Sequence, residues 1–381
     1  MKKINQSGNG ILYTSGTFLI PVLKGTYKEM GMQYGELMKD DMQKVYDIVI
    51  QPQIDSGSIT GDVAKKWTHR ALSTFSSRNK DFYEGLQQST GWSMDKIGIL
   101  DQVTEFGIFQ SKMHSFAGCT SIMTWGTASK DGNSYIGRNM DWSASFSEFA
   151  QVLTVVNPTD GGYRYANLGW PGMITLYTGI NEHGVYIDLH DGSSMGGSVV
   201  FADRAPFMNV LVDILSETKS LDATVSRLNA SRTSVGLILS LADQNSGASM
   251  ECASWGDHRV RRSDDDTMVV VNSFLNPDWG IHKRDTVSHS LERFSNMTAR
   301  LAENKGNIDA QKVRDLMDMR LFNEDGSFKE NGGCTKPTKQ DADQTTHQMV
   351  TDVAQRIVWL KVPNPKYLTD WVEIDLKKLW S

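Results

Sequence analysis

Hydrophobic positions divide the chain into a helical first part and a strand-rich remainder. In the first part, apolar residues recur at helical spacing and share one face; they are Tyr34, Met38, Met42, Val45 and Val49. Thr26 and Glu29 stand ahead of this run as a capping box, the pattern that begins a helix. Gly31 and Gly35 lie four apart on the same helix and leave room for another element to pack closely.

Further helices are predicted at 62–75, 79–88 and 94–110, with a break at Gly91-Trp92-Ser93. Residues 1–118 are therefore expected to be mostly helical.

From Cys119 the pattern favours strands. Residues 120–125 and 134–136 are rich in β-formers, and the turn signal at 130–133 between them predicts a hairpin. Strands are also predicted at 151–156, 163–166, 185–189, 235–241, 248–253, 268–271, 350–362 and 371–376. Helices are predicted at 206–216, 221–228, 284–303 and 309–321, and a long polar loop at 323–343. This order predicts an α+β fold in which helices cover two sheets.

Composition and charge narrow the classes of function. Hydrophobic residues make up 39% of the 381 residues and charged residues 22%, as in an ordinary globular protein. The net charge is −6, and the basic stretch 259–262 is followed at once by acidic 264–266, so nucleic acid binding is not expected. No run approaches the ~20 apolar residues of a membrane span. A small molecule is the expected partner, and homo-oligomerisation stays open.

The three cysteines do not require a disulfide framework. A bridge between Cys252 and Cys334 would leave Cys119 free. Residues 1–3 have the basic start of a signal peptide, but no apolar stretch follows. The compartment therefore stays open between the cytoplasm and export with a signal peptide already removed. No His-x-x-x-His, Cys-x-x-Cys or phosphate-loop motif occurs, so neither a metal nor another cofactor is expected.

The predicted hairpin carries the strongest candidate chemistry. Its antiparallel return brings Arg138 and Asp141 towards Cys119. A thiol attacks a carbonyl as the thiolate, whose unperturbed pKa is about 8.5, and a neighbouring guanidinium lowers that pKa because it favours the charged form. A carboxylate can orient the attacking group. The alternative is a buried structural cysteine beside an ordinary ion pair.

Several motifs resemble those of the Cys-type N-terminal-nucleophile amidohydrolases, the group of acid ceramidase, N-acylethanolamine acid amidase, choloylglycine hydrolases and penicillin acyltransferases. The resemblance covers nearly the whole chain, and the most specific matches are Gly118-Cys119-Thr120-Ser121-Ile122 and Gly137-Arg138-Asn139-Met140-Asp141-Trp142. Supporting matches lie at 23–35, 169–172, 179–185, 269–274, 345–346, 356–359 and 374–376. The resemblance implies a four-layer αββα fold. It also implies that residues 1–118 are a pro-segment and residues 119–381 the catalytic domain, with no cofactor.

The resemblance also implies roles for site residues. The Gly118–Cys119 bond is cut autocatalytically, Cys119 becomes the nucleophile, and its freed α-amine is the base. Such an amine has a pKa of about 7.7–8.0, close to working pH. Arg138 lies beside the thiol, Asp141 binds the new amine, and Asn272 donates to the oxyanion.

Two positions depart from the family pattern. Asp191 falls where relatives carry an Asn, and an ionised Asp accepts hydrogen bonds but cannot donate them. The ceramidase branch has an Arg about a dozen residues past the Asn, for which Arg284 is the first match here and Arg293 the second.

The expected activity is hydrolysis of a linear, non-peptide amide through a thioester on Cys119. Ten Trp and eighteen Met suit either core filling or an adaptable cleft for a lipid or aromatic acyl group. Three alternatives remain: an acyltransferase, an unprocessed or non-catalytic binding protein on the same fold, and a papain-like enzyme with His282 or His289 as base.

Overall fold

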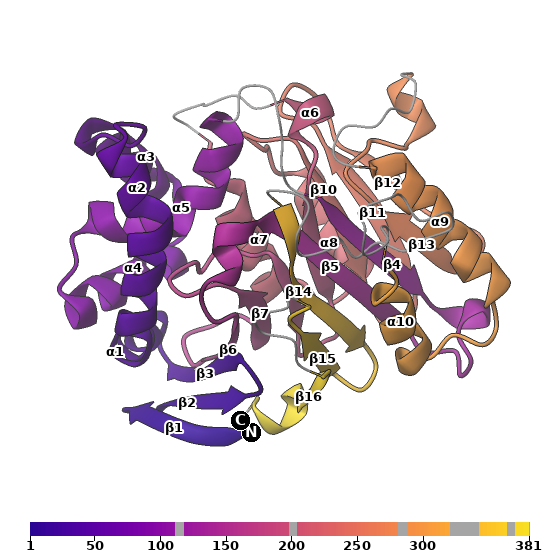
Figure 1. Cartoon of the computed structure of the whole chain (residues 1–381), viewed down its shortest axis with the longest axis horizontal. Coiled ribbons are helices and arrows are strands. Elements are labelled where there is room, and N and C mark those ends of the chain that lie inside the picture. Colours follow the sequence, from indigo (N-terminus) through magenta and orange to yellow (C-terminus); the bar gives the residue numbers. More distant parts are fainter. Residues whose placement is uncertain (111–117, 198–203, 281–288, 321–342, 364–369, 381) are drawn as a thin grey trace.

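The computed structural model describes residues 1–110, 118–197, 204–280, 289–320, 343–363 and 370–380 (Figure 1). The helices are α1 (Tyr27–Val45), α2 (Gln51–Asp55), α3 (Gly61–Thr74), α4 (Ser77–Thr90), α5 (Met94–Gln110), α6 (Ser193–Gly196), α7 (Phe207–Glu217), α8 (Leu221–Asn229), α9 (Ser290–Glu303) and α10 (Ala310–Met317). The first eight strands are β1 (Lys2–Ser7), β2 (Gly10–Ser15), β3 (Phe18–Gly25), β4 (Cys119–Thr124), β5 (Tyr135–Ser143), β6 (Val152–Pro158), β7 (Tyr165–Gly169) and β8 (Thr178–Asn181). The other strands are β9 (Tyr186–Asp191), β10 (Leu237–Ala242), β11 (Gly247–Cys252), β12 (Arg259–Arg261), β13 (Thr267–Val270), β14 (Asp343–Asp352), β15 (Ile357–Lys361) and β16 (Val372–Asp375).

The described strands form two sheets. A ten-stranded sheet has the order β1-β2-β3-β6-β7-β8-β9-β10-β11-β12, and a six-stranded sheet has the order β13-β4-β5-β14-β15-β16. Neighbouring strands are antiparallel except β3 and β6, which pair in parallel. The polypeptide that precedes Cys119 therefore supplies one edge of a sheet whose other strands follow Cys119.

Three apolar clusters define the layers. One lies between the ten-stranded sheet and helices α1, α3, α4, α5 and α7, one lies between the two sheets, and one lies between the six-stranded sheet and helices α9 and α10. The strand β4 shows how the pleat serves two layers, since Ile122 packs towards the outer helices while Met123 packs between the sheets. The molecule is thus a four-layer αββα arrangement (Figure 1), as predicted.

The helix α1 begins as its sequence predicts. The Thr26 hydroxyl accepts from the Glu29 N–H while the Glu29 carboxylate accepts from the Thr26 N–H, which completes the capping box. Gly31 then faces α4, where a Cβ atom would lie 2.1 Å from the carbonyl oxygen of Phe82. The missing side chain at Gly31 lets the two helix backbones touch.

The structure differs from the sequence expectation at both ends. Three strands, β1 to β3, precede the helices of the first 118 residues. The single strand expected at 350–362 is wrong, because the chain turns after Asp352 and returns as β15, with Arg356 in the left-handed region at a φ of 60°. The helix predicted at 284–303 begins at Ser290 within the described residues. The predicted loop 323–343 lies almost wholly outside the described residues.

Charged groups also connect the first 118 residues to the rest. Arg70 of α3 is paired with Glu105 of α5 at 3.0 Å, and its Nη2 donates to the Ser234 hydroxyl at 2.7 Å. Arg70 and Glu105 are buried, at 5% and 1% exposed. Burial raises the pKa of Glu105, although Arg70 opposes that shift.

Candidate active site

Cys119 is the first residue of β4, and the β4–β5 hairpin places the predicted residues around it. The antiparallel register sets Cys119 opposite Met140 and Ser121 opposite Arg138. Arg138 Nη2 donates to Cys119 Sγ at 3.1 Å, and Met140 Sδ lies 3.7 Å from the same sulfur. The hairpin prediction therefore locates the guanidinium correctly.

The thiol itself is buried, with Cys119 1% exposed. Burial raises the pKa of the Cys119 thiol above its ordinary value, and the nearby guanidinium groups of Arg138 and Arg293 only partly offset this. Arg138 lowers the thiol pKa as expected, but in the continuous chain desolvation outweighs this effect and the net pKa is raised. In this form Cys119 is a protonated thiol at neutral pH.

Backbone carbonyls fix the position of Arg138. Its Nη2 donates to the Leu189 carbonyl at 2.6 Å, and its Nη1 donates to the Asn139 carbonyl at 2.9 Å. The side chain is fully buried between the sheets. Arg138 is thus held against the sulfur by groups whose hydrogen bonding does not depend on pH.

Asp141 lies on the same strand, next to the bond before the cysteine. Its N–H donates to the Gly118 carbonyl at 2.9 Å. Its carboxylate accepts from the Thr345 hydroxyl at 2.5 Å, and Asp141 is fully buried. Asp141 therefore contacts the Gly118 side of the predicted cleavage site through its backbone.

Asn272 follows β13 and bridges Cys119 to the end of β9. Its Oδ1 accepts from the Cys119 N–H at 2.7 Å, and its Nδ2 donates to the Asp191 carbonyl at 3.0 Å. The Asp191 carboxylate accepts from the Ser193 N–H at 2.8 Å, a turn contact that begins α6. Asp191 thus meets Asn272 through its backbone.

Of the two candidate arginines, Arg293 lies at the site and Arg284 lies outside the described residues. Arg293 projects from α9, fully buried, and its Nη1 donates to the Cys119 carbonyl and to the Thr120 hydroxyl, the latter at 2.7 Å. Its Nη2 donates to Asn272 Oδ1 at 3.1 Å. The second choice from the sequence is therefore the arginine that the structure places against the cysteine.

Sequence reasoning missed two polar residues beneath Arg138. Asp188 and His190 of β9 are both buried, and His190 Nε2 lies 3.0 Å from Asp188 Oδ1. The signal was present, because Tyr186, Asp188 and His190 alternate along a strand buried on both faces. Polar side chains at alternate positions of such a strand have to meet partners in the core.

The described contacts of the thiol offer no histidine base. Cys119 Sγ contacts Arg138 and Met140, whereas His289 lies 3.7 Å from Glu292 at the start of α9. His282 lies outside the described residues. Cys252 is a free, buried thiol, so it is not bridged to Cys334, which also lies outside the described residues.

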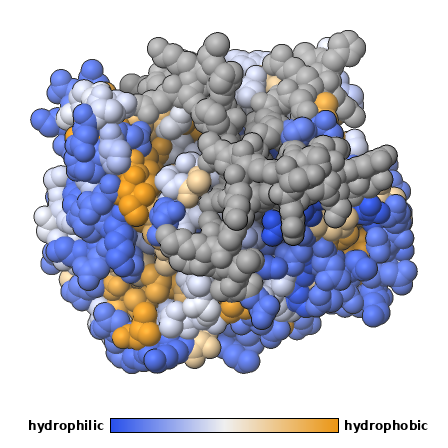
Figure 2. All heavy atoms as spheres, in the orientation of Figure 1, coloured by the Kyte–Doolittle hydropathy of each residue, from blue (hydrophilic) through white to orange (hydrophobic). Residues whose placement is uncertain are grey.

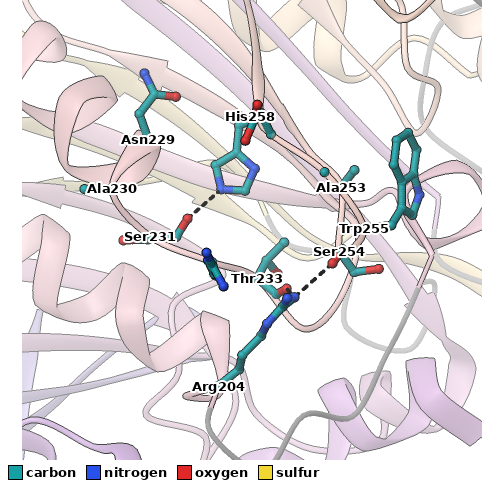
Figure 3. A pocket seen from close by; sticks show the side chains of 12 residues that line it. Arg204, Asn229, Ala230, Ser231, Thr233, Ala253, Ser254, Trp255 and His258 are labelled. Carbon is teal, nitrogen blue, oxygen red and sulfur yellow. Dashed lines mark hydrogen bonds between the residues drawn. The ribbon is translucent and has the colours of Figure 1, made fainter.

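A surface pocket lies away from the cysteine, in the part of the chain that the structure describes. A pocket of about 730 Å³ lies beyond the ends of α8 and β11 and includes Arg204, Ser231, Thr233, Trp255 and His258. In Figure 3, Arg204 reaches the carbonyls of Thr233 and Ser254, and His258 reaches that of Ser231. None of the predicted site residues lines this pocket.

No group of three metal-ligating side chains occurs in the described parts of the chain. Among the helices that the structure describes, none is long and apolar enough to cross a membrane.

The face shown in Figure 2 is largely hydrophilic, with apolar residues in a strip at the left, beside the N-terminal helices.

Comparison with known proteins gives one family match. The model of the family described as "Acyl-coenzyme A:6-aminopenicillanic acid acyl-transferase" matches residues 127–367. That range contains Arg138, Asp141, Asp191, Asn272 and Arg293, and it begins after Cys119.

One relative in sequence has low identity to the chain. A protein of Archaeoglobus fulgidus described as uncharacterized is 21% identical over an alignment of 348 residues, which covers 78% of this chain and 57% of that protein. The chain thus spans little more than half the length of this relative.

Partial structural similarity extends to solved proteins, of which three are named here. Penicillin V acylase from Agrobacterium tumefaciens has a TM-score of 0.49 at 15% identity, over 69% of this chain and 88% of that one. A mutant conjugated bile acid hydrolase from Clostridium perfringens has a TM-score of 0.47 at 14% identity, over 68% of this chain and 93% of that one. The N-acylethanolamine-hydrolyzing acid amidase ortholog of Caenorhabditis elegans has a TM-score of 0.39 at 16% identity, over 62% of this chain and 93% of that one.

Proposed function

Because the chain belongs to the acyl-coenzyme A:6-aminopenicillanic acid acyl-transferase family of N-terminal-nucleophile hydrolases, we propose that it is an autoprocessing cysteine amidohydrolase. Its substrate is a linear N-acyl amide, and the reaction proceeds through a thioester on Cys119. Residues 1–118 are the pro-segment, and residues 119–381 carry the catalytic residues.

One observation carries this proposal. The sulfur, amide nitrogen and carbonyl oxygen of Cys119 are bound by Arg138, Asn272 and Arg293 in turn. A structural cysteine needs none of these contacts. Three polar partners on one buried residue are the arrangement expected of a nucleophile whose neighbouring peptide bond is also a reaction centre.

Self-cleavage is the first step of the proposed mechanism. Cys119 Sγ adds to the Gly118 carbonyl carbon, the Gly118–Cys119 C–N bond breaks, and the thiol proton passes to the nitrogen of Cys119. The Asp141 N–H, 2.9 Å from the Gly118 oxygen, is suited to stabilise the oxyanion of this step. Water then hydrolyses the Gly118 thioester, which leaves a carboxylate on Gly118 and restores the thiol beside the α-amine that C–N cleavage had freed.

The freed amine supplies the base for the amide substrate. It takes the thiol proton, Sγ attacks the substrate carbonyl carbon, and the ammonium returns the proton to the leaving amine. Water then cleaves the acyl thioester and releases a carboxylic acid. In the continuous chain Asn272 Oδ1 accepts from the Cys119 N–H. Cleavage removes that amide, and we propose that the Asn272 amide group then donates to the substrate oxyanion.

The family description favours acyl transfer as a second candidate. The thioester is the same in both reactions, and the outcome depends on whether water or a second amine attacks it. Supplying hydroxylamine during turnover separates the two, since an acyltransferase forms hydroxamate at the expense of free acid while a strict hydrolase does not.

The test starts from the intact mass of the denatured, reduced protein. Cleavage gives two species, residues 1–118 and residues 119–381. Cys119→Ala gives one full-length species with no amide turnover. Cys252→Ala, the matched control at the other described cysteine, leaves both intact. A panel of N-acylethanolamines, conjugated bile acids and penicillins then identifies the acyl group. Turnover by the Cys119→Ala protein would refute the proposal.

A further inference from the structure

A polar cluster joins the two sheets directly beneath Cys119. The six-stranded sheet contributes Ser121 and Arg138, and the ten-stranded sheet contributes Tyr186, Asp188 and His190. All five side chains are fully buried. An isolated cation is unstable in such surroundings, so Arg138 needs a negative partner within the cluster.

Asp188 is the carboxylate in position to be that partner. Its Oδ2 lies 3.9 Å from Arg138 Nε. This contact is too long to be a hydrogen bond, and the pose of Arg138 is set by the carbonyls of Leu189 and Asn139. Asp188 therefore contributes charge rather than geometry to Arg138.

Two hydroxyl donors and a neighbouring imidazole keep Asp188 ionised. The hydroxyls of Ser121 and Tyr186 donate to its Oδ2 at 2.7 and 2.9 Å, and His190 Nε2 lies 3.0 Å from Oδ1. Despite burial, Arg138 and His190 hold the pKa of Asp188 at about 2. Burial and Arg138 lower the pKa of His190 to about 4, so His190 is neutral at pH 7.

We propose that Asp188 acts on the nucleophile through Arg138: it shares the guanidinium charge with Cys119 and so adds to the burial that keeps the thiol protonated in the resting site. The same guanidinium faces two anions, one permanent and one formed only when the thiol ionises. Removing the permanent anion leaves the whole charge for the thiolate. This role rests on the proposed function only for its effect on catalysis, since the thiol titrates whether or not an amide is cleaved.

Other groups around Cys119 set the background for this titration. They are Asp141 from β5, Arg293 from α9, Asp191 at the end of β9, and His347 from β14.

The test is a titration of Cys119 by the ultraviolet absorbance of its thiolate. Cys334→Ser serves as the background, and the matching Cys119→Ala protein supplies the baseline that removes tyrosine absorbance. Burial holds the pKa of Cys252 far above its ordinary value, so that thiol stays silent. Mass measurement assigns the cleavage state of each protein. The two Cys119-containing proteins are compared in the same state, and the two Cys119→Ala baselines are both full-length.

Asp188→Asn is expected to lower the Cys119 pKa by about one unit or more, and to move the acid limb of any amidase pH profile with it. Asp101→Asn is the control, because Asp101 is as deeply buried and accepts from Tyr83 and Asn209. The control lowers the unfolding temperature without moving the thiol pKa. An unchanged or raised thiol pKa in Asp188→Asn overturns the inference.

A double-mutant cycle with Arg138→Gln covers the case in which Asp188→Asn folds poorly. Each single variant leaves one buried charge without its partner, whereas the double variant removes both. The double variant is therefore expected to unfold at a higher temperature than Asp188→Asn alone. Additive losses would show that Asp188 and Arg138 do not act as a pair and would overturn the inference. If Asp188 fails these tests while Cys119→Ala still abolishes cleavage, the proposed function stands without it.

Discussion

His347 makes the stability of the protein depend on pH in a way that one substitution can isolate. The residue lies on β14 opposite Met140, fully buried, and its Nδ1 meets Gln151 Oε1 at 2.7 Å. Burial, helped by the positive charge of Arg138, lowers the pKa of His347 to about 3. The folded protein therefore holds this imidazole neutral throughout the range from pH 4 to pH 7.

The unfolded chain takes up a proton at this histidine near pH 6.5, whereas the folded chain does so only near pH 3. Between these values the unfolded state binds more protons, so stability is fully present above about pH 6.5 and falls as the pH is lowered. One proton corresponds to about 1.4 kcal/mol per pH unit, or about 2 kcal/mol between pH 6 and pH 4.5. That is a large part of the 5–15 kcal/mol that typically separates folded and unfolded states.

The measurement compares wild type with His347→Gln by urea denaturation at each half unit from pH 4.5 to pH 7.5. Only the difference between the two proteins is diagnostic, because Asp213, whose pKa burial raises to about 6, has the opposite slope in this range. The advantage of wild type over the variant should shrink by about 2 kcal/mol from pH 6 to pH 4.5. His69→Gln, at an exposed position on α3, should parallel wild type. A difference that stays constant with pH would refute the reasoning.

The packing and charge of the N-terminal helices give two further contrasts. Gly31→Ala should cost about 1–3 kcal/mol of unfolding free energy because its Cβ would meet the backbone of α4. Gly107→Ala, with nothing within 4 Å of the new Cβ, should be neutral or stabilising. Equal costs of the two substitutions in thermal denaturation would contradict the close approach of the helices. Arg70→Met should cost about 3–5 kcal/mol because it leaves Glu105 buried and unpaired. Lys28→Ala, at an exposed ion pair, should cost less than about 1 kcal/mol, and a comparable loss from both would show that burial is not what makes the Arg70 pair matter.

Local patterns in the sequence were enough to predict the parts of the fold that depend on neighbours in the chain. The capping box of α1 and the β4–β5 hairpin are set by residues a few positions apart. The hairpin alone places Arg138 beside Cys119. Strands β1 to β3 escaped prediction although β1 pairs with β2, and β2 with β3, as antiparallel neighbours in the chain. The pairing of β3 with β6, more than a hundred residues later, is the part that no local pattern shows.

The same limit applies to the candidate site. Cys119, Arg138 and Asp141 stand close together in the sequence, whereas Arg293 reaches Cys119 from α9, 174 positions away. The net pKa of the thiol also could not be predicted, because the charge of Arg138 is visible in the sequence while the burial that outweighs it is not. Asp188 needed the strand pairing of both sheets before its partner could be named.

The parallel pairing of β3 with β6 has a kinetic consequence for the proposed cut. The ten-stranded sheet contains strands from both sides of the Gly118–Cys119 bond, and β3 is hydrogen-bonded to β6. The two pieces of a cleaved chain would therefore share one continuous sheet. Their separation would then be the same event as unfolding. The uncut chain refolds in a first-order process, whereas the cut protein would have to find its other piece, at a rate that depends on concentration. Dilution would therefore slow the recovery of the cleaved form and leave that of the Cys119→Ala form unchanged.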